Sequence, residues 1–159
     1  MTVITDYSAT NQDKLDGFFH EAFQSCGFAY EPEGKHSNLR NIDEFFVKTG
    51  GGFWVLMQEN NVVGSAGLFI YNKEQLIGEL KCLYLLPSIQ GKGYGQLMMK
   101  KVIEEAKHRK LHYLRLDVKQ NAFKAINLYH KNSFYEIDRY NGNPNDVIFM
   151  ELNLKNQSI

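Results

Sequence analysis

Cysteine and histidine are scarce in this sequence, and their spacing excludes two kinds of site. There are two cysteines, Cys26 and Cys82, too few for a disulfide framework or a zinc site. We interpret both as small buried apolar residues, Cys26 on the apolar face of a helix and Cys82 within a strand. The five histidines show no metal-ligand spacing. No metal site is therefore predicted.

An excess of charge and a long apolar run are also absent. The 18 basic and 18 acidic residues cancel, which argues against a nucleic-acid partner because binding to it needs a basic surface. No stretch approaches the ~18 consecutive apolar residues of a membrane span, so no membrane role is predicted. The first residues lack the basic and apolar segments of a signal peptide, and we expect a cytoplasmic protein.

What is present is the apolar content and periodicity of one globular domain, which we expect to occupy residues 1–159. Apolar residues make up 43% of the chain. Alternating apolar positions predict strands, and three-and-four spacing predicts helices. The predicted strands are Thr2–Tyr7, Phe53–Gln58, Val62–Tyr71, Leu76–Leu86, Tyr113–Val118, Phe134–Tyr140 and Val147–Leu154. The predicted helices are Asn11–Phe28, Asn38–Lys48, Gln96–Arg109 and Ala122–Lys131.

The order of these elements predicts the fold class. The segment from Leu76 to Val118 has the order strand, helix, strand, so its two strands should be parallel and joined by a right-handed crossover. The other strands follow one another through short turns, which favours antiparallel pairing. We therefore predict an α/β (α+β) fold with a mixed, mostly antiparallel central sheet and helices on both faces.

A glycine-rich loop, Gln90-Gly91-Lys92-Gly93-Tyr94-Gly95, separates a predicted strand from a predicted helix. It lacks the Ser or Thr that follows Gly-Lys in a Walker A loop, and Gln96 stands where a Rossmann fingerprint has glycine. Glycines let successive backbone N–H groups converge on one anion at the positive end of a helix. The loop is therefore either a pyrophosphate site or a tight turn into the helix.

Two groups of residues carry a family resemblance. Gln90, Gly93 and Gly95 follow the strand that Pro87 ends, and a second group comprises Asn121, Ala125, Tyr129, Lys131 and Phe134. Together they resemble the GCN5-related N-acetyltransferase (GNAT) superfamily, whose acetyl-CoA motif is Gln/Arg-x-x-Gly-x-Gly/Ala after a bulged strand. The order of elements also matches a small, single-domain, bacterial-type member along nearly the whole chain. Ser133 departs from the family's usual glycine, in a helix-capping turn.

The resemblance implies an activity and a cofactor site. The implied activity is transfer of an acetyl group from acetyl-CoA to a primary amine of a small molecule or peptide, by direct attack in a ternary complex and without a metal. The implied cofactor-binding residues are Leu83, Tyr84, Leu85, Gln90, Gly91, Lys92, Gly93, Tyr94, Gly95, Gln96, Asn121 and Ala125. For Asn121, capping of the following helix is an alternative role.

Two side chains are candidates for the chemistry. Glu79 is the candidate base, because the acceptor ammonium, with a pKa near ~10, must lose a proton before it attacks. Strand alternation predicts that Glu79 shares a face with Lys81, Leu83 and Leu85. Its alternative roles are that of a solvated strand glutamate or of an ion-pair partner for Lys81. Tyr129 is the candidate acid for the leaving thiolate, and packing against the sheet is the alternative.

The acceptor pocket is expected near Tyr30, Trp54, Tyr140 and Asn143. Two other hypotheses share the fold: a non-catalytic CoA-binding or regulatory module, and an acyltransferase that uses another acyl-CoA or an oxygen acceptor. The family resemblance also allows a homodimer, for which the sequence indicates no interface. The acceptor amine is not identified by any motif.

Overall fold

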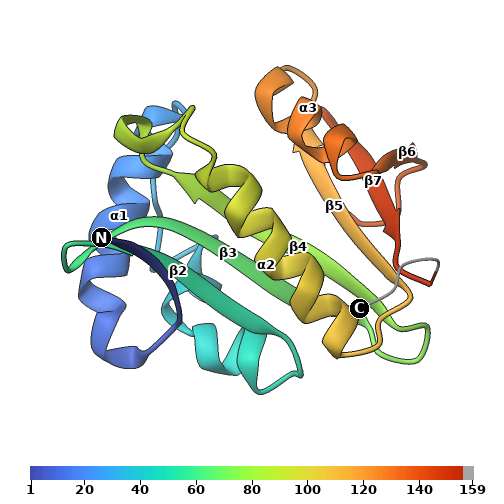
Figure 1. Ribbon diagram of the computed structural model, residues 1–159, viewed down its shortest axis with the longest axis horizontal. Helices are drawn as coiled ribbons and strands as arrows, with labels where there is room; N and C mark the ends of the chain where they lie inside the picture. Colours follow the sequence, from blue (N-terminus) through green and yellow to red (C-terminus); the bar gives the residue numbers. More distant parts are fainter. Residues whose placement is uncertain (156–159) are drawn as a thin grey trace.

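Residues 1–155 are described by a computed structural model, and a seven-stranded sheet forms their centre (Figure 1). The strands lie in the order β1-β2-β3-β4-β5-β7-β6. Neighbouring strands are antiparallel except β4 and β5, which are parallel, as the crossover predicted. The strands are β1 (Thr2–Asp6), β2 (Gly52–Gln58), β3 (Asn61–Asn72), β4 (Ile77–Leu85), β5 (Tyr113–Lys119), β6 (Tyr135–Ile137) and β7 (Val147–Asn153).

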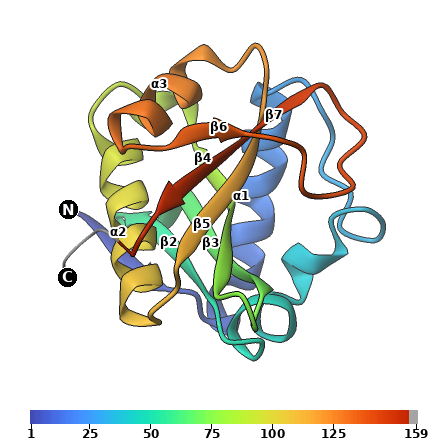
Figure 2. The same ribbon diagram turned by 90° about the vertical axis from the view of Figure 1, so that its right-hand side faces the viewer.

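Helices cover both faces of the sheet, which confirms the predicted fold class. α1 (Gln12–Ser25) lies on one face, and α2 (Tyr94–His108) and α3 (Phe123–Lys131) lie on the other (Figure 2). The remaining helical turns are η1 (Ala9–Asn11), η2 (Ser37–Arg40), η3 (Asp43–Val47) and η4 (Pro87–Ile89). Within residues 1–155, none of the helices combines the length and the apolar character needed to cross a membrane.

Each face of the sheet has its own apolar core. The core under α1 is rich in phenylalanine and includes Phe19, Phe23 and Phe53. The core under α2 includes Met98 from that helix and Leu114 from β5. Burial of one such side chain stabilises the fold by about 1.5–3 kcal/mol, so these stripes hold the helices against the sheet. The three-and-four spacing of apolar residues in both helices is thereby explained.

The prediction of one helix at Asn38–Lys48 is wrong. The chain forms two separate turns there, a 3-10 turn at Ser37–Arg40 and a π-helical turn at Asp43–Val47. Asn41 lies between them with φ −131° and ψ 45°, and its amide Nδ2 donates to the Ser37 carbonyl at 2.8 Å. The asparagine side chain thus bonds the carbonyl that a continuous helix would use, which is how asparagine competes with helix formation.

The prediction that Cys26 is buried is also wrong. α1 ends at Ser25, and Cys26 is exposed just beyond it. Gly27 follows with φ 87°, a left-handed conformation that commonly ends a helix. Because the chain turns away at that point, Cys26 does not lie on the apolar stripe of α1.

The parallel pairing of β4 with β5 is short. Three residues of β4, from Ile77 to Glu79, pair with Tyr113 to Arg115 of β5. Beyond Glu79, β4 pairs with β3 but with no strand on its other side in the described chain, while β5 pairs with β7. Figure 1 shows the two strands diverging toward the end of β4. The sheet is therefore split at its middle, next to the glycine loop.

Candidate active site

A β-bulge in β4 creates the first feature of the site. Gly67 of β3 is opposite Lys81, and Ser65 is opposite Tyr84, so two residues of β4 face one residue of β3. Cys82 has φ 58°, an unusual conformation for a residue other than glycine. The hydroxyl of the fully buried Ser65 donates to the Cys82 carbonyl at 2.7 Å. That hydrogen bond satisfies a carbonyl in the part of the ladder that the bulge disturbs.

The bulge corrects the prediction that Glu79 and Lys81 share a face with Leu83 and Leu85. Side chains alternate along a regular strand, but an inserted residue moves all later side chains to the opposite face. Leu83 and Leu85 pack against the core under α2. Glu79 and Lys81 instead line a cavity on the α1 side, together with Tyr84. The candidate base and the two leucines thus lie on opposite faces of β4.

The glycine loop presents backbone rather than side chains. Gly91 has φ 76° and Gly93 has φ 91°, and a Cβ atom added at either residue would meet no heavy atom within 4 Å. α2 begins at Tyr94 directly after Gly93, without a side chain that caps it. The first N–H groups of a helix have no partner within the helix and carry its positive end. An anion with several oxygen atoms fits this open, donor-rich turn.

Several predicted loop side chains bind other parts of the protein. The amide Nε2 of Gln90 donates to the Leu85 carbonyl at 3.0 Å. The Tyr94 hydroxyl lies 3.3 Å from Oγ1 of Thr2. The Gln96 side chain makes two hydrogen bonds with the side chain of Asn132, at 2.8 and 3.0 Å. These contacts fix the loop, and Lys92 is exposed.

Glu79 lies at the centre of the polar network of the site. Its side chain is only 5% exposed, and its Oε2 accepts hydrogen bonds from the Tyr140 hydroxyl and, at 3.2 Å, from Asn141 Nδ2. Its Oε1 forms an ion pair with Lys81 Nζ at 3.2 Å. Asn141 Nδ2 also donates to Oδ2 of Asp117 at 2.9 Å, so one amide joins two carboxylates. The ion pair with Lys81, one alternative role for Glu79, is present.

The net effect of burial and neighbouring charge raises the pKa values of two residues in this network, Lys81 and Tyr140. Burial lowers the pKa of Lys81, but the neighbouring Glu79 carboxylate outweighs it, and the net effect raises that pKa. Burial, then the charge of Glu79, raises the pKa of Tyr140 far above its usual value. Lys81 is therefore a cation and Tyr140 a neutral hydrogen-bond donor at neutral pH.

The second motif lies at the start and on the buried side of α3. Tyr129 is 7% exposed and packs against Phe134 with ring centroids 5.8 Å apart. Burial, assisted by the charge of Asp117, raises the pKa of Tyr129 to about 12. Ala125 is half-buried against the core under α2. Asn121 does not cap the helix: Ala122 holds the capping position and no side chain in the described chain caps it.

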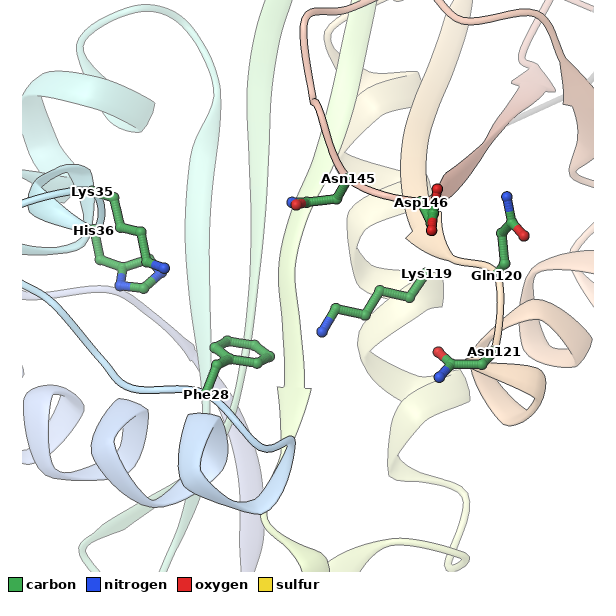
Figure 3. Close-up of a pocket in the computed structure, with 8 residues that line it drawn as sticks. All are labelled: Phe28, Lys35, His36, Lys119, Gln120, Asn121, Asn145 and Asp146. Atoms are coloured by element: carbon green, nitrogen blue, oxygen red, sulfur yellow. The ribbon is translucent and has the colours of Figure 1, made fainter.

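Two adjoining pockets open on the α1 side of the diverging strands. The inner pocket, about 350 Å³, is lined by Glu79, Lys81, Asp117 and Asn143 among others. The outer pocket, about 620 Å³, is lined by Phe28, Lys35, His36, Lys119, Gln120, Asn121, Asn145 and Asp146 (Figure 3). Lys35 and His36 line both pockets. A molecule of moderate size can therefore extend from the surface to Glu79.

Of the four residues expected near the acceptor, two lie at the inner pocket. Asn143 lines the pocket, and Tyr140 reaches it through its hydrogen bond to Glu79. Tyr30 is buried in the core under α1, where its hydroxyl donates to Asp16 at 2.8 Å. Trp54 lies on the opposite face, in the core under α2. Tyr30 thus shares the face of the pockets but is used in the core, whereas Trp54 lies on the wrong face.

Sequence reasoning missed Asp117, Lys119 and Asn141. Asp117 and Lys119 are polar positions of β5 that alternate with buried Leu116 and Val118, and this alternation was the signal available. Asn141 belongs to the loop between β6 and β7, and no pattern in the sequence indicates that this loop reaches Glu79 and Asp117.

The chain is similar in sequence to known acetyltransferases. A family model described as the acetyltransferase (GNAT) family matches residues 16–134. An uncharacterized N-acetyltransferase of Escherichia coli K12, YjgM, is 33% identical over 104 residues, which cover 64% of this chain and 61% of that protein. The alignment thus spans less than two thirds of that relative.

Solved structures share the fold. A GNAT-family acetyltransferase of Staphylococcus aureus Mu50 has a TM-score of 0.86 at 22% identity and covers 97% of this chain and 99% of its own. YncA of Salmonella typhimurium, solved with its cofactor acetyl-CoA, has a TM-score of 0.76 at 17% identity and covers 100% of this chain and 97% of its own. The family model spans most of the chain, from α1 to the end of the second motif. The protein is therefore a member of the acetyltransferase (GNAT) family.

Proposed function

We propose that this protein transfers the acetyl group of acetyl-CoA to the primary amine of a small molecule or peptide. The observation that carries the proposal is the unpaired edge of β4 beyond Glu79, which leads directly to the positive-φ loop at the start of α2. Acetyl-CoA supplies an activated acetyl thioester when bound. A pyrophosphate and an amide-containing arm require the two features that lie next to each other here, namely a cluster of backbone N–H donors and a strand edge.

The residues around the split sheet would hold this molecule through backbone groups. Gly91 and Gly93 would turn the loop N–H groups toward the pyrophosphate. The backbone of Leu83 and Leu85 lies on the unpaired stretch of β4 and would bind the pantetheine amides. Asn121 is exposed at the end of β5, where its side chain is available to the same arm.

Glu79 and Tyr129 remain the proposed proton-transfer residues. Glu79 lies in the inner pocket, where an acceptor ammonium would arrive, and would accept its proton directly or through water. The Lys81 ammonium already pairs with Glu79, so it competes with the acceptor ammonium for the same carboxylate. Tyr129, with a pKa of about 12, keeps its proton at neutral pH and would donate it to the leaving thiolate.

Calorimetric titration of acetyl-CoA and CoA into the purified protein tests cofactor binding. Wild type should bind both, and Gly93→Trp should lose binding because tryptophan at φ 91° distorts the loop. Gly17→Trp is the matched control: Gly17 lies in α1, where an added Cβ meets nothing within 4 Å. Failure of wild type to bind acetyl-CoA would reject the proposal.

Thiol release from acetyl-CoA in the presence of amines tests the chemistry. Glu79→Gln should lower kcat by about 10²-fold or more if Glu79 is the general base. A protein that binds CoA but acetylates no amine would instead be a non-catalytic CoA-binding module. Faster turnover with longer acyl thioesters than with acetyl-CoA would show that the donor is another acyl-CoA.

A further inference from the structure

Two oppositely charged residues of β5 have no ion-pair partner in the described part of the chain. Asp117 and Lys119 are two positions apart on one face of the strand, while Leu116 and Val118 face the core. The Cα atoms of residues two apart in a strand are separated by about 6.6–6.8 Å. One small molecule can therefore contact both side chains. Among residues 1–155, neither Asp117 nor Lys119 takes part in an ion pair.

Asp117 adds a second negative charge to the inner pocket. Lys81 forms its ion pair with Glu79 at 3.2 Å, and the charge of Asp117 also raises the Lys81 pKa, so two carboxylates share one ammonium. Asp117 receives only the neutral amide of Asn141, at 2.9 Å, from the side chains around it in the described chain. Two carboxylates that share one cation leave an excess negative charge, which favours the binding of an ammonium group. The floor of the pocket is therefore suited to the amine end of an acceptor.

Lys119 gives the outer pocket a positive charge that no carboxylate of residues 1–155 neutralises through an ion pair. Figure 3 shows its side chain extending toward Phe28 from the opposite wall, and Nζ lies 4.6 Å from the centre of the Phe28 ring. The other lysine of this pocket, Lys35, pairs with Glu31 at 3.1 Å. Asp146 also lines the pocket, and the ion pairs of the described residues do not include one between it and Lys119. Lys119 is thus the cation available to an anionic group of a bound molecule.

From these two charges we infer that the acceptor is a small zwitterion, an amine that also carries a carboxylate, as a free amino acid does. Its ammonium binds Asp117, next to Glu79, and its carboxylate binds Lys119. This inference rests on the proposed function and narrows its acceptor. The amino end of a peptide lacks a carboxylate next to its amine and leaves Lys119 without a partner.

The test compares free amino acids with their carboxamides as acceptors. The carboxamide lacks the negative charge and its amine has a lower pKa, so kcat/KM is expressed per unprotonated amine. Wild type should show a kcat/KM at least about tenfold higher for the amino acid, the effect of one charge-assisted hydrogen bond. Lys119→Gln should reduce this ratio by about tenfold. Lys73→Gln removes the same charge from an exposed position in the turn between β3 and β4, and should keep the wild-type ratio. Calorimetry of both acceptor sets against the CoA-loaded protein measures the same preference without chemistry.

The outcomes separate this inference from the proposed function. Equal or faster acetylation of the carboxamides would overturn the zwitterionic acceptor and leave the transferase intact. A preference for the carboxylate that persists in Lys119→Gln would overturn the assignment to Lys119. If neither set is acetylated while another amine is, the zwitterionic acceptor is overturned and the proposed function stands. If no amine is acetylated, the proposed function fails, and calorimetry still decides whether the pocket selects the carboxylate.

Discussion

Gly93, the residue before α2, has φ 91° and ψ 0°, and this conformation allows its replacement to be predicted quantitatively. An alanine Cβ at this position would meet no heavy atom within 4 Å, so a steric clash with neighbours contributes nothing. The remaining cost is the left-handed backbone, about 1–2 kcal/mol for a residue other than glycine. In a protein of this size that cost lowers Tm by about 2–8 °C.

Gly17→Ala provides the control with the opposite sign. Gly17 lies in the middle of α1 with open space around an added Cβ and without a positive φ. Alanine there should stabilise the protein by about 0.5–1 kcal/mol, because glycine loses more backbone entropy in a helix. The same chemical change, from glycine to alanine, should thus lower Tm at one site and raise it at the other.

Both variants are measured by thermal unfolding and by titration with CoA. The loop variant can relieve its strain only by moving backbone N–H groups away from their present directions, so Gly93→Ala should also weaken CoA binding by about 5–30-fold, the equivalent of 1–2 kcal/mol. Gly17→Ala should bind CoA as wild type does. If Gly93→Ala unfolds at the wild-type temperature, the left-handed conformation is not required and the reasoning is refuted.

Three further predictions follow from single residues. Ser133 has φ 72° in the turn after α3, so Ser133→Gly should raise the free energy of unfolding by about 1 kcal/mol in urea denaturation; an unchanged midpoint would argue against strain there. Burial raises the pKa of Cys82 to about 12, so its thiol stays protonated and unreactive up to pH 10, and an alkylating reagent should label only Cys26 in the folded protein and both thiols after unfolding. Tyr129→Phe should lower kcat by about 10²-fold with less than about 1 kcal/mol change in stability, and wild-type kcat should not fall through Tyr129 ionisation below pH 10, because its pKa is about 12; an unchanged kcat would favour a packing role instead, since phenylalanine keeps the ring.

The sequence predicted those parts of the fold that depend on periodic burial. The apolar stripes of α1 and α2 repeat every three and four residues, and both helices lie where these stripes indicated. The parallel pairing of β4 with β5 followed from chain connectivity, because a strand-helix-strand unit closes in one way. Periodicity failed at Asn38–Lys48, where the Asn41 side chain interrupts the helix.

The backbone conformation of the glycine loop was predictable from the sequence, but the faces on which the side chains of β4 lie were not. Gly91 and Gly93 are recognisable because positive φ favours glycine, whereas Cys82 takes the same backbone region without any sequence signal. The bulge at Cys82 then moves Leu83 to the face opposite Glu79. The contacts of Asn141 depend on the path of a loop, which neither propensity nor periodicity determines. The roles of Glu79 and Tyr129 remain predictions.

The short pairing of β4 with β5 has a consequence for the folding of the chain during its synthesis. Strand edges with free N–H and C=O groups recruit strands from other molecules, and proteins usually block such edges with charge, proline or a covering element. Here the end of β4 faces, across the gap, the part of the sheet formed by β5, β6 and β7 (Figure 1). During synthesis the first four strands leave the ribosome before β5 does. Until the last three strands follow, this edge is open to strand addition, and a chain truncated after α2 should aggregate.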